Sequence, residues 1–205
     1  MVRLIESKLK DISTLLGEMA VLSQKALSLA VESFVNNRPL EHEAFTLAEQ
    51  LRSLHDKVMD LSTEAIARYQ PVATDLRFIR ACGEVSYGLY RTGRYAYDIV
   101  GTVTVFGDLR GCSWDDVIRT SGVVKEMLTL AIEAFSNLDE RQALDVIRMD
   151  DVVDGEYRRY LSRVIEGGGE RRCDIAGLLI MRYLERMADH ANAIAEAALY
   201  VVRGT

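Results

Sequence analysis

Proline, cysteine and aromatic residues are all scarce in this sequence. Its 205 residues include two prolines and three cysteines, and 7% are Phe, Trp or Tyr. No apolar run reaches the 18 or so residues that a membrane-spanning helix needs, and no segment is typical of a signal sequence. These absences exclude a collagen-like fold and a spanning helix, and they lead us to expect a cytoplasmic protein.

The three cysteines, Cys82, Cys112 and Cys173, are widely spaced along the chain. Their number is odd and no two form a Cys-x-x-Cys pair, so the sequence indicates neither a disulfide framework nor a zinc ribbon. This pattern favours a reducing compartment.

The chain carries an excess of acidic residues, with a formal net charge of −6 and a pI near 5.2. A general clamp on nucleic-acid phosphates needs a basic face that displaces counterions, so we do not expect nucleic acid as a partner. Hydrophobic residues make up 49% of the chain and charged residues 27%, which is typical of a globular protein.

Apolar residues recur at spacings of three and four over long segments, which is the period of an α-helix. The pattern predicts an all-α protein. Pro39 and Pro71 interrupt it, Thr74 or Asp75 can cap the helix after the second interruption, and Ser113 to Asp116 has the spacing of a capping box. The six predicted helices run up to about residue 36, over 41–69, from 74 or 75 to 106, from 113 to 138, from a cap at Asp139 to the glycines 167–169, and over 174–202.

Two segments of the first half of the chain recur in the second half. AVESF at 30–34 is echoed by AIEAF at 131–135, and LYRTGRYAYDIV at 89–100 aligns with LERMADHANAIA at 184–195. The repeat predicts two tandem antiparallel three-helix bundles, formed by residues 1–110 and 111–205. A single continuous bundle is the alternative, because its sequence pattern would differ little.

Two acidic stripes mark the last two predicted helices. On the last helix Glu185, Asp189, Asn192 and Glu196 step by four, three and four residues, which places them within about 60° of one another around the helix axis. The preceding helix carries Asp150 and Asp154 at the same spacing, with Asp151 beside them. Like charges at this spacing repel each other, so two facing stripes require a counter-charge.

Two interpretations of these stripes remain open. Arg148, Arg158, Arg182 and Arg186 lie nearby in sequence and could form surface ion pairs across a solvated acidic face. Alternatively, carboxylates from two neighbouring helices could form a cation site, since oxygen ligands suit magnesium, calcium, manganese or iron.

The usual signatures of an enzyme are absent. Di-iron oxidases in helical bundles use Glu-x-x-His pairs, but Pro39, Arg52 and Met187 stand three residues before the histidines at positions 42, 55 and 190. No Walker loop, dinucleotide fingerprint or Ser-His-Asp grouping is present either. We therefore expect a protein that is not an enzyme.

Two motifs closely resemble those of the PhoU family of phosphate-uptake regulators. They are QPVATDLR at 70–77 and RYLERMADHANAIAE at 182–196, and the resemblance extends over essentially the whole chain. It implies two three-helix bundles that can each hold a metal cluster through carboxylate pairs at i, i+4. In the second repeat the implied ligands are Asp150 with Asp154 and Glu185 with Asp189, and the metal would be iron, zinc, magnesium or manganese.

The first repeat departs from the family pattern. Tyr90 and Arg94 stand where Glu and Asp are expected, and Ala48 and Arg52 replace the other pair. Because a guanidinium at Arg94 would repel a cation, we predict that only the second repeat binds metal.

The resemblance also implies a function exerted through protein contacts. The expected protein is a metal-binding regulator of phosphate uptake and phosphate-starvation signalling, whose partners are the ATP-binding subunit of the phosphate transporter and a sensor histidine kinase. It would meet the membrane only through these partners, and a homodimer is expected. The alternatives are a metal-storage or metal-sensing protein and a metal-free helical adaptor.

Overall fold

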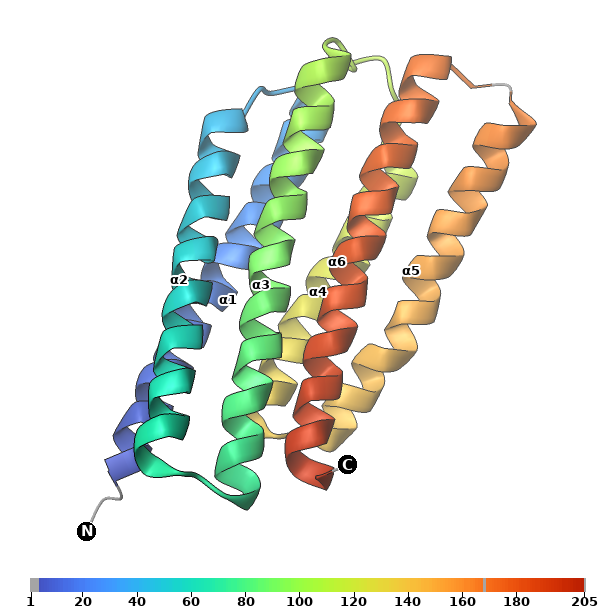
Figure 1. Cartoon of the computed structure of the whole chain (residues 1–205). Helices are drawn as coiled ribbons and strands as arrows, with labels where there is room; N and C mark the ends of the chain where they lie inside the picture. The colour runs from blue at the N-terminus through green and yellow to red at the C-terminus, as the bar shows by residue number, and fades with distance from the viewer. Residues whose placement is uncertain (1–3, 168, 205) are drawn as a thin grey trace.

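The computed structural model describes residues 4–167 and 169–204 and confirms the all-α prediction. Within these ranges the chain forms six helices and no strand. They are α1 (Leu4–Asn36), α2 (Glu41–Tyr69), α3 (Ala73–Phe106), α4 (Asp115–Asn137), α5 (Glu140–Glu166) and α6 (Arg171–Arg203), and Figure 1 shows them running up and down one elongated molecule.

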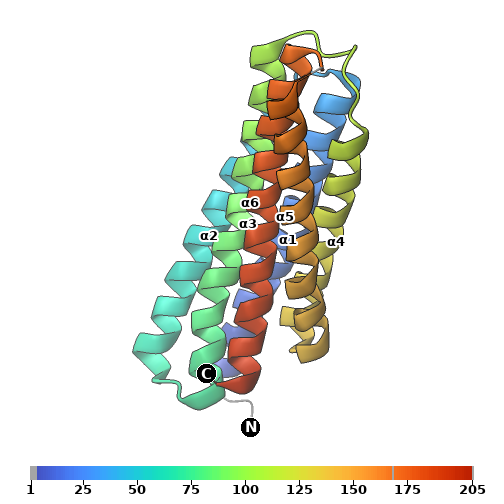
Figure 2. The ribbon, with the colours of Figure 1, turned by 90° about the vertical axis from the view of Figure 1, so that its right-hand side faces the viewer.

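The helices form two groups of three that meet along α3 and α6. Helix α3 packs against α1, α2 and α6, whereas α6 packs against α3, α4 and α5. Figures 1 and 2 both show α3 and α6 side by side, and in the view of Figure 1 they lie at the centre, with α2 and α5 at the outer edges. One continuous apolar core runs through both groups, with Leu51 and Ile99 fully buried in the first and Met127 and Ile180 in the second.

Small residues let α3 and α6 approach closely. A Cβ at Gly88 of α3 would lie 3.2 Å from Ile194 Cδ1 and 3.3 Å from the backbone oxygen of His190, both on α6. Elsewhere along α3, Phe78 stacks on Phe135 of α4, with 5.4 Å between the ring centroids. We call the contact between α3 and α6 the α3–α6 seam.

The helix ends confirm some predicted caps and correct others. Asp139 caps α5, since its Oδ1 accepts a hydrogen bond from the Gln142 amide at 3.1 Å, and Gly167 ends that helix with a φ of 78°. Two predicted caps were wrong. Helix α4 begins at Asp115 without a side-chain cap, because the Ser113 hydroxyl donates to Asp115 Oδ2 at 3.0 Å, and α3 begins at Ala73, before Thr74 and Asp75.

The prediction that no disulfide forms was also wrong. Cys112 in the α3–α4 connection is bonded to Cys173 in the first turn of α6, with 5.4 Å between their Cα atoms. Sequence spacing gave no sign of this bond because the fold alone brings the two residues together. Cys82 is buried as a free thiol, and burial raises its pKa to about 12.

The hydropathy of the helices tests the expectation that the chain has no membrane-spanning helix. In the part of the chain that the structure describes, no helix combines the length and the apolar character required for crossing a bilayer.

Candidate metal centre

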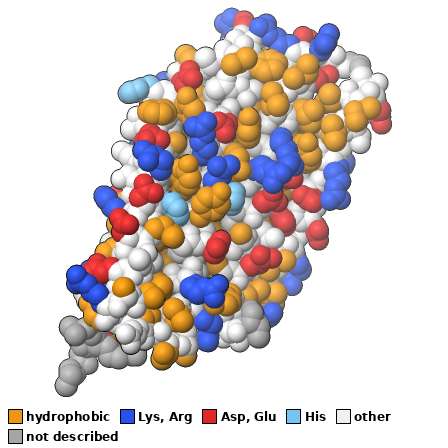
Figure 3. Space-filling view, in the orientation of Figure 1, with side chains coloured by type: hydrophobic (Ala, Val, Ile, Leu, Met, Phe, Trp, Pro, Cys, Tyr) orange, Lys and Arg blue, Asp and Glu red, His pale blue; other side chains and the backbone are white. Residues whose placement is uncertain are grey.

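The four predicted ligands lie on two adjacent helices. Asp150 and Asp154 project from α5, and Glu185 and Asp189 project from α6, which packs directly against α5. All four side chains are partly buried. Figure 3 shows acidic side chains gathered over the middle of α5 and α6, with basic side chains around them.

The carboxylate of Asp150 experiences the strongest electrostatic perturbation of the four. Burial, together with the negative charges of Asp189, Asp154, Asp151 and Glu185, raises its pKa to about 6. Two of these charges come from α6, so the two predicted pairs lie near each other across the α5–α6 interface. A carboxyl whose charge is disfavoured in this way is a good candidate for a cation site.

Glu185 and Asp189 respond to the same surroundings. Burial is the main cause that raises the pKa of each, and the Asp154 charge on the neighbouring helix adds to it. Arg182 and Arg186 act in the opposite direction on both groups. Neighbouring guanidinium groups therefore compensate the acidic charge only in part.

Three buried oxygens of this region have no hydrogen-bond partner. They are Asp150 Oδ1, Glu185 Oε2 and Asn192 Oδ1. Buried polar atoms are normally satisfied, and an exception calls for an explanation such as an ion. These oxygens fit the donor set of a hard cation, and Asn192 belongs to the stripe that the sequence pattern identified on α6.

Arginines neutralise part of the cluster, as the alternative interpretation of the stripes expected. Asp154 pairs with Arg158 at 2.8 Å, Glu185 with Arg182 at 2.5 Å, and Asp189 with Arg186 at 3.2 Å. The pairs of Asp154 and Asp189 each use the Oδ2 atom, whereas Glu185 meets an arginine at both oxygens, since its Oε2 also lies 3.7 Å from Arg186 Nε. The Arg158 side chain is largely exposed, whereas those of Arg182 and Arg186 are more than half buried.

The four carboxylates are near one another without forming a closed cage. Among the described residues, no three of them bring one oxygen each to within 4.8 Å of the others. Side-chain rotation would be needed before three of them could share one ion. The remaining members of the stripes, Asp151 and Glu196, are exposed.

The corresponding face of the first repeat has a different character. Arg94 pairs with Asp98 at 3.3 Å and lies over the Tyr97 ring, whereas Ala48 is buried and supplies no ligand atom. Arg52 pairs with Glu49 at 2.7 Å. The prediction that this repeat binds no metal remains a prediction, and the positive charge at Arg94 and Arg52 agrees with it.

Sequence reasoning missed a cluster of aromatic rings between the two repeats. The His190 ring lies 5.7 Å from the Tyr87 ring and 5.9 Å from the Tyr95 ring. Burial, together with Arg91 and Arg186, lowers the pKa of His190 to about 4, so the ring is neutral at pH 7. The tyrosines come from a helix far away in sequence, so only the fold could reveal this packing.

Several known proteins resemble this chain along nearly its full length. A "Phosphate-specific transport system accessory protein PhoU homolog 1" of Methanothermobacter thermautotrophicus is 30% identical, covering 97% of this chain and 94% of the relative. A "Phosphate-specific transport system accessory protein PhoU homolog" of Pseudomonas aeruginosa is 28% identical, covering 97% of this chain and 85% of the relative.

Solved structures show the same fold. The crystal structure of PhoU from Pseudomonas aeruginosa has a TM-score of 0.89 and 27% identity, covering 98% of this chain and 99% of the other. The phosphate transport system regulatory protein PhoU from Streptococcus pneumoniae has a TM-score of 0.88, and at 16% identity this likeness concerns the fold alone.

The repeat seen in the sequence also has a counterpart in a family model. The model described as "PhoU domain" matches residues 16–103 and again residues 117–198, so one match falls on each group of three helices. Together the two matches span most of the sequence, and the chain therefore belongs to the PhoU family.

Proposed function

We propose that this protein is a regulatory accessory protein of phosphate transport that acts through protein contacts and not through catalysis. The observation that carries the proposal is the full-length match to relatives named as phosphate transport accessory proteins. The proposed partner is the ATP-binding subunit of the transporter, together with a sensor histidine kinase in a source that has one. We further propose that it acts in the cytoplasm, as a homodimer.

We also propose that the carboxylates on α5 and α6 hold a metal ion that takes part in this regulation. The residues involved are Asp150, Asp154, Glu185 and Asp189. A bound cation would supply the positive charge that offsets their mutual repulsion and would link the two helices. Binding of this kind stabilises the folded state by about 2.7 kcal/mol when the free ion exceeds its Kd a hundredfold. The metal would thereby fix the α5–α6 surface that a partner contacts.

Elemental analysis of purified protein tests the metal site. The wild type is compared with Glu185→Ala and Asp189→Ala, and Glu196→Ala serves as the control because Glu196 is exposed on the same helix. We expect metal in the wild type and the control, and loss of metal in the two site variants. Equal metal content in all four proteins would eliminate the site. Bound metal far above one small cluster per chain would instead favour storage.

A metal-free adaptor is the second candidate function. The observation that favours it is the pairing of Asp154, Glu185 and Asp189 with arginines. In that case the arginines alone provide the counter-charge, and removal of metal leaves the protein contacts unchanged. Affinity capture with the transporter ATPase subunit, in the presence and absence of a chelator, separates the two functions. Failure to capture the subunit under either condition would reject the regulatory proposal.

A further inference from the structure

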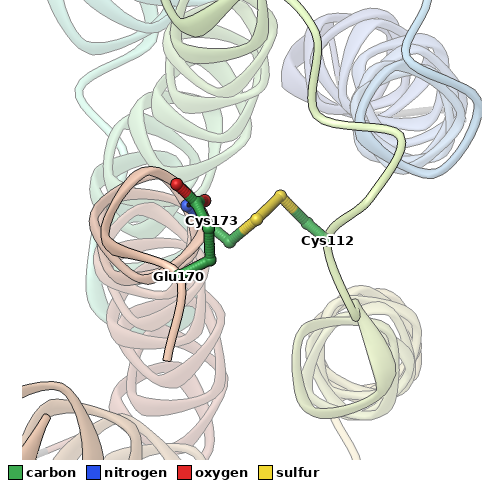
Figure 4. A group of neighbouring side chains, drawn as sticks. All are labelled: Cys112, Glu170 and Cys173. Carbon is green, nitrogen blue, oxygen red and sulfur yellow. Dashed lines mark hydrogen bonds between the residues drawn. A yellow bond between two sulfur atoms is a disulfide. The ribbon is translucent and has the colours of Figure 1, made fainter. Parts of the chain in front are cut away.

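A second group of possible metal ligands lies at one end of the molecule. Figure 4 shows Cys112, Cys173 and Glu170 together where the α3–α4 connection meets the start of α6. One ligand atom from each residue lies within 4.8 Å of the other two. Within the chain from 4 to 204, Gly168 excepted, no other group of three His, Cys, Asp or Glu residues meets this condition.

Cys112 is held in place by more than its disulfide. Leu109, three residues earlier, is buried, and its amide donates to Asn37 Oδ1 at 2.9 Å. Trp114, two residues later, is buried against Phe34, with 5.5 Å between ring centroids. The Cys112 amide itself donates to the Leu109 carbonyl at 3.0 Å. Breaking the disulfide would therefore leave the Cys112 backbone where it is.

Cys173 and Glu170 are positioned by the start of α6. Glu170 is the N-cap residue, and its Oε2 accepts a hydrogen bond from the Cys173 amide at 2.8 Å. This bond uses one carboxylate oxygen and leaves the other available. Both cysteine side chains are partly accessible to solvent, so reagents and ions can reach them.

The geometry suits a tetrahedral zinc ion once the disulfide is open. With Zn–S bonds of about 2.3 Å and a Zn–O bond of about 2.0 Å, tetrahedral angles place the ligand atoms about 3.5–3.8 Å apart. The Cα–Cα distance of 5.4 Å allows this separation through rotation of the cysteine side chains. Water would complete the fourth position.

The electrostatic surroundings suit the same complex. Two thiolates and one carboxylate around Zn²⁺ carry a net charge of −1. The start of a helix favours negative charge and promotes thiolate formation. Positive charge also lies here, since Arg110 and, to a smaller extent, Arg172 lower the pKa of Asp108 in the α3–α4 connection. The thiolate complex is therefore stabilised by its surroundings.

We propose that Cys112, Cys173 and Glu170 form a redox-controlled zinc site. Reduction by a dithiol transfers two electrons and two protons to the Cys112–Cys173 bond, which yields two protein thiols and the disulfide of the dithiol. Zinc binding then releases the two thiol protons to solvent, and the thiolates and the Glu170 carboxylate bind one Zn²⁺. The α3–α4 connection is thus tied to α6 by a covalent bond in the oxidised state and by zinc in the reduced state.

This site is independent of the carboxylate cluster on α5 and α6. Cys173 precedes Glu185 by twelve residues on the same helix, which corresponds to about 18 Å along its axis. The proposal goes beyond the regulatory function and does not depend on it. Experiments in a Glu185→Ala/Asp189→Ala background separate zinc at the cysteines from zinc at the carboxylates.

The test measures zinc binding in the reduced and oxidised states of the full chain in that background. The protein is reduced with a dithiol, which gel filtration under argon then removes, and Zn²⁺ is titrated against a chromophoric chelator. We expect one Zn²⁺ per reduced chain and none at this site in the oxidised chain. Cys112→Ser and Cys173→Ser abolish binding, and Glu170→Gln weakens it at least about tenfold. Circular dichroism checks that each variant remains helical.

Three results would overturn the proposal. Zinc binding by the reduced chain that is absent, or that is unchanged in Cys112→Ser, would eliminate the site. Three reactive thiols in the air-oxidised, unfolded chain, where Cys82 alone is expected, would eliminate the redox control. Glu170→Gln keeps both cysteines and the disulfide, so its zinc affinity tests the ligand set even if a serine variant folds poorly.

Discussion

At the scale of single residues, Asp150 is the member of the carboxylate cluster whose pKa is raised most clearly. Its pKa is about 6 in the folded chain, compared with about 3.9 in an unfolded chain. Between these pH values the folded chain holds a proton that the unfolded chain has lost. The free energy of unfolding therefore falls as the pH rises from about 4 to about 6, and it stays lower above that window.

We expect Asp150→Asn to stabilise chelator-treated protein at pH 7.5 and to have little effect at pH 4. The gain is about 1 kcal/mol once solvent screening of this partly exposed group is considered. Urea unfolding at a series of pH values measures it. Asp151→Asn is the control, because Asp151 is exposed, and its effect should stay within about 0.5 kcal/mol. An equal gain at pH 4 and pH 7.5 would contradict the pKa assignment.

The sequence could predict which acidic residues share a helix face, but it could not predict their hydrogen-bond partners or their protonation. Spacing of four residues placed Asp150 and Asp154 together, and Glu185 and Asp189 together, because helix geometry is local. The unpartnered oxygen of Asn192 and the neutral state of His190 depend on groups from other helices. The Cys112–Cys173 bond escaped prediction for the same reason.

At the scale of helices, a glycine sets how closely α5 and α6 pack. The Tyr160 ring of α5 lies over Gly177 of α6, and a Cβ at Gly177 would stand 2.7 Å from Tyr160 Cζ. Tyr160 is 5% exposed, so its ring has little space in which to move. This contact therefore sets the spacing between α5 and α6, the two helices that carry the candidate metal ligands.

We expect Gly177→Ala to destabilise the protein by about 1–3 kcal/mol, because the new methyl group overpacks the Tyr160 ring. Gly155→Ala is the matched control on α5, since nothing lies within 4 Å of a Cβ there. The control should gain about 0.5–1 kcal/mol from helix propensity. Guanidinium unfolding of both variants measures the difference, and a stable Gly177→Ala would show that the ring can shift.

Helix boundaries followed the sequence well where local signals set them. The predicted second helix matches α2, and the predicted end of the third matches the end of α3 at Phe106. The cap at Asp139 was also correct. The capping box at Ser113 failed because its hydroxyl bonds to Asp115, and α6 begins at Arg171, before the predicted 174, because Glu170 caps it. The spacing of residues along the sequence does not show that the Ser113 hydroxyl bonds to a neighbouring side chain and not to the helix backbone.

At the scale of the whole molecule, the α3–α6 seam joins the two groups of helices. Trp114, the single tryptophan, adds a contact at one end, because it packs on Phe34 of α1 while standing at the start of α4. We expect one cooperative unfolding transition. Trp114 fluorescence and far-UV circular dichroism should give the same midpoint. Two separate midpoints would show that the repeats unfold as independent domains.

The disulfide should also contribute to the stability of the whole chain. It joins residues 61 positions apart, and closing a loop of this length stabilises the fold by about 4 kcal/mol in the chain-entropy treatment. We expect reduction in the presence of a zinc chelator to lower the guanidinium midpoint of the wild type and to leave Cys112→Ser unchanged. Equal midpoints before and after reduction of the wild type would contradict this contribution.

Helix α6 presents Glu185 and Asp189 toward α5 and Ile194 toward Gly88 of α3. One added or deleted residue between Asp189 and Ile194 would turn these two faces by about 100° relative to each other. Either Glu185 and Asp189 would turn away from Asp150, or α3 and α6 would no longer pack closely at the α3–α6 seam. The number of residues in this stretch is therefore fixed by angular phase.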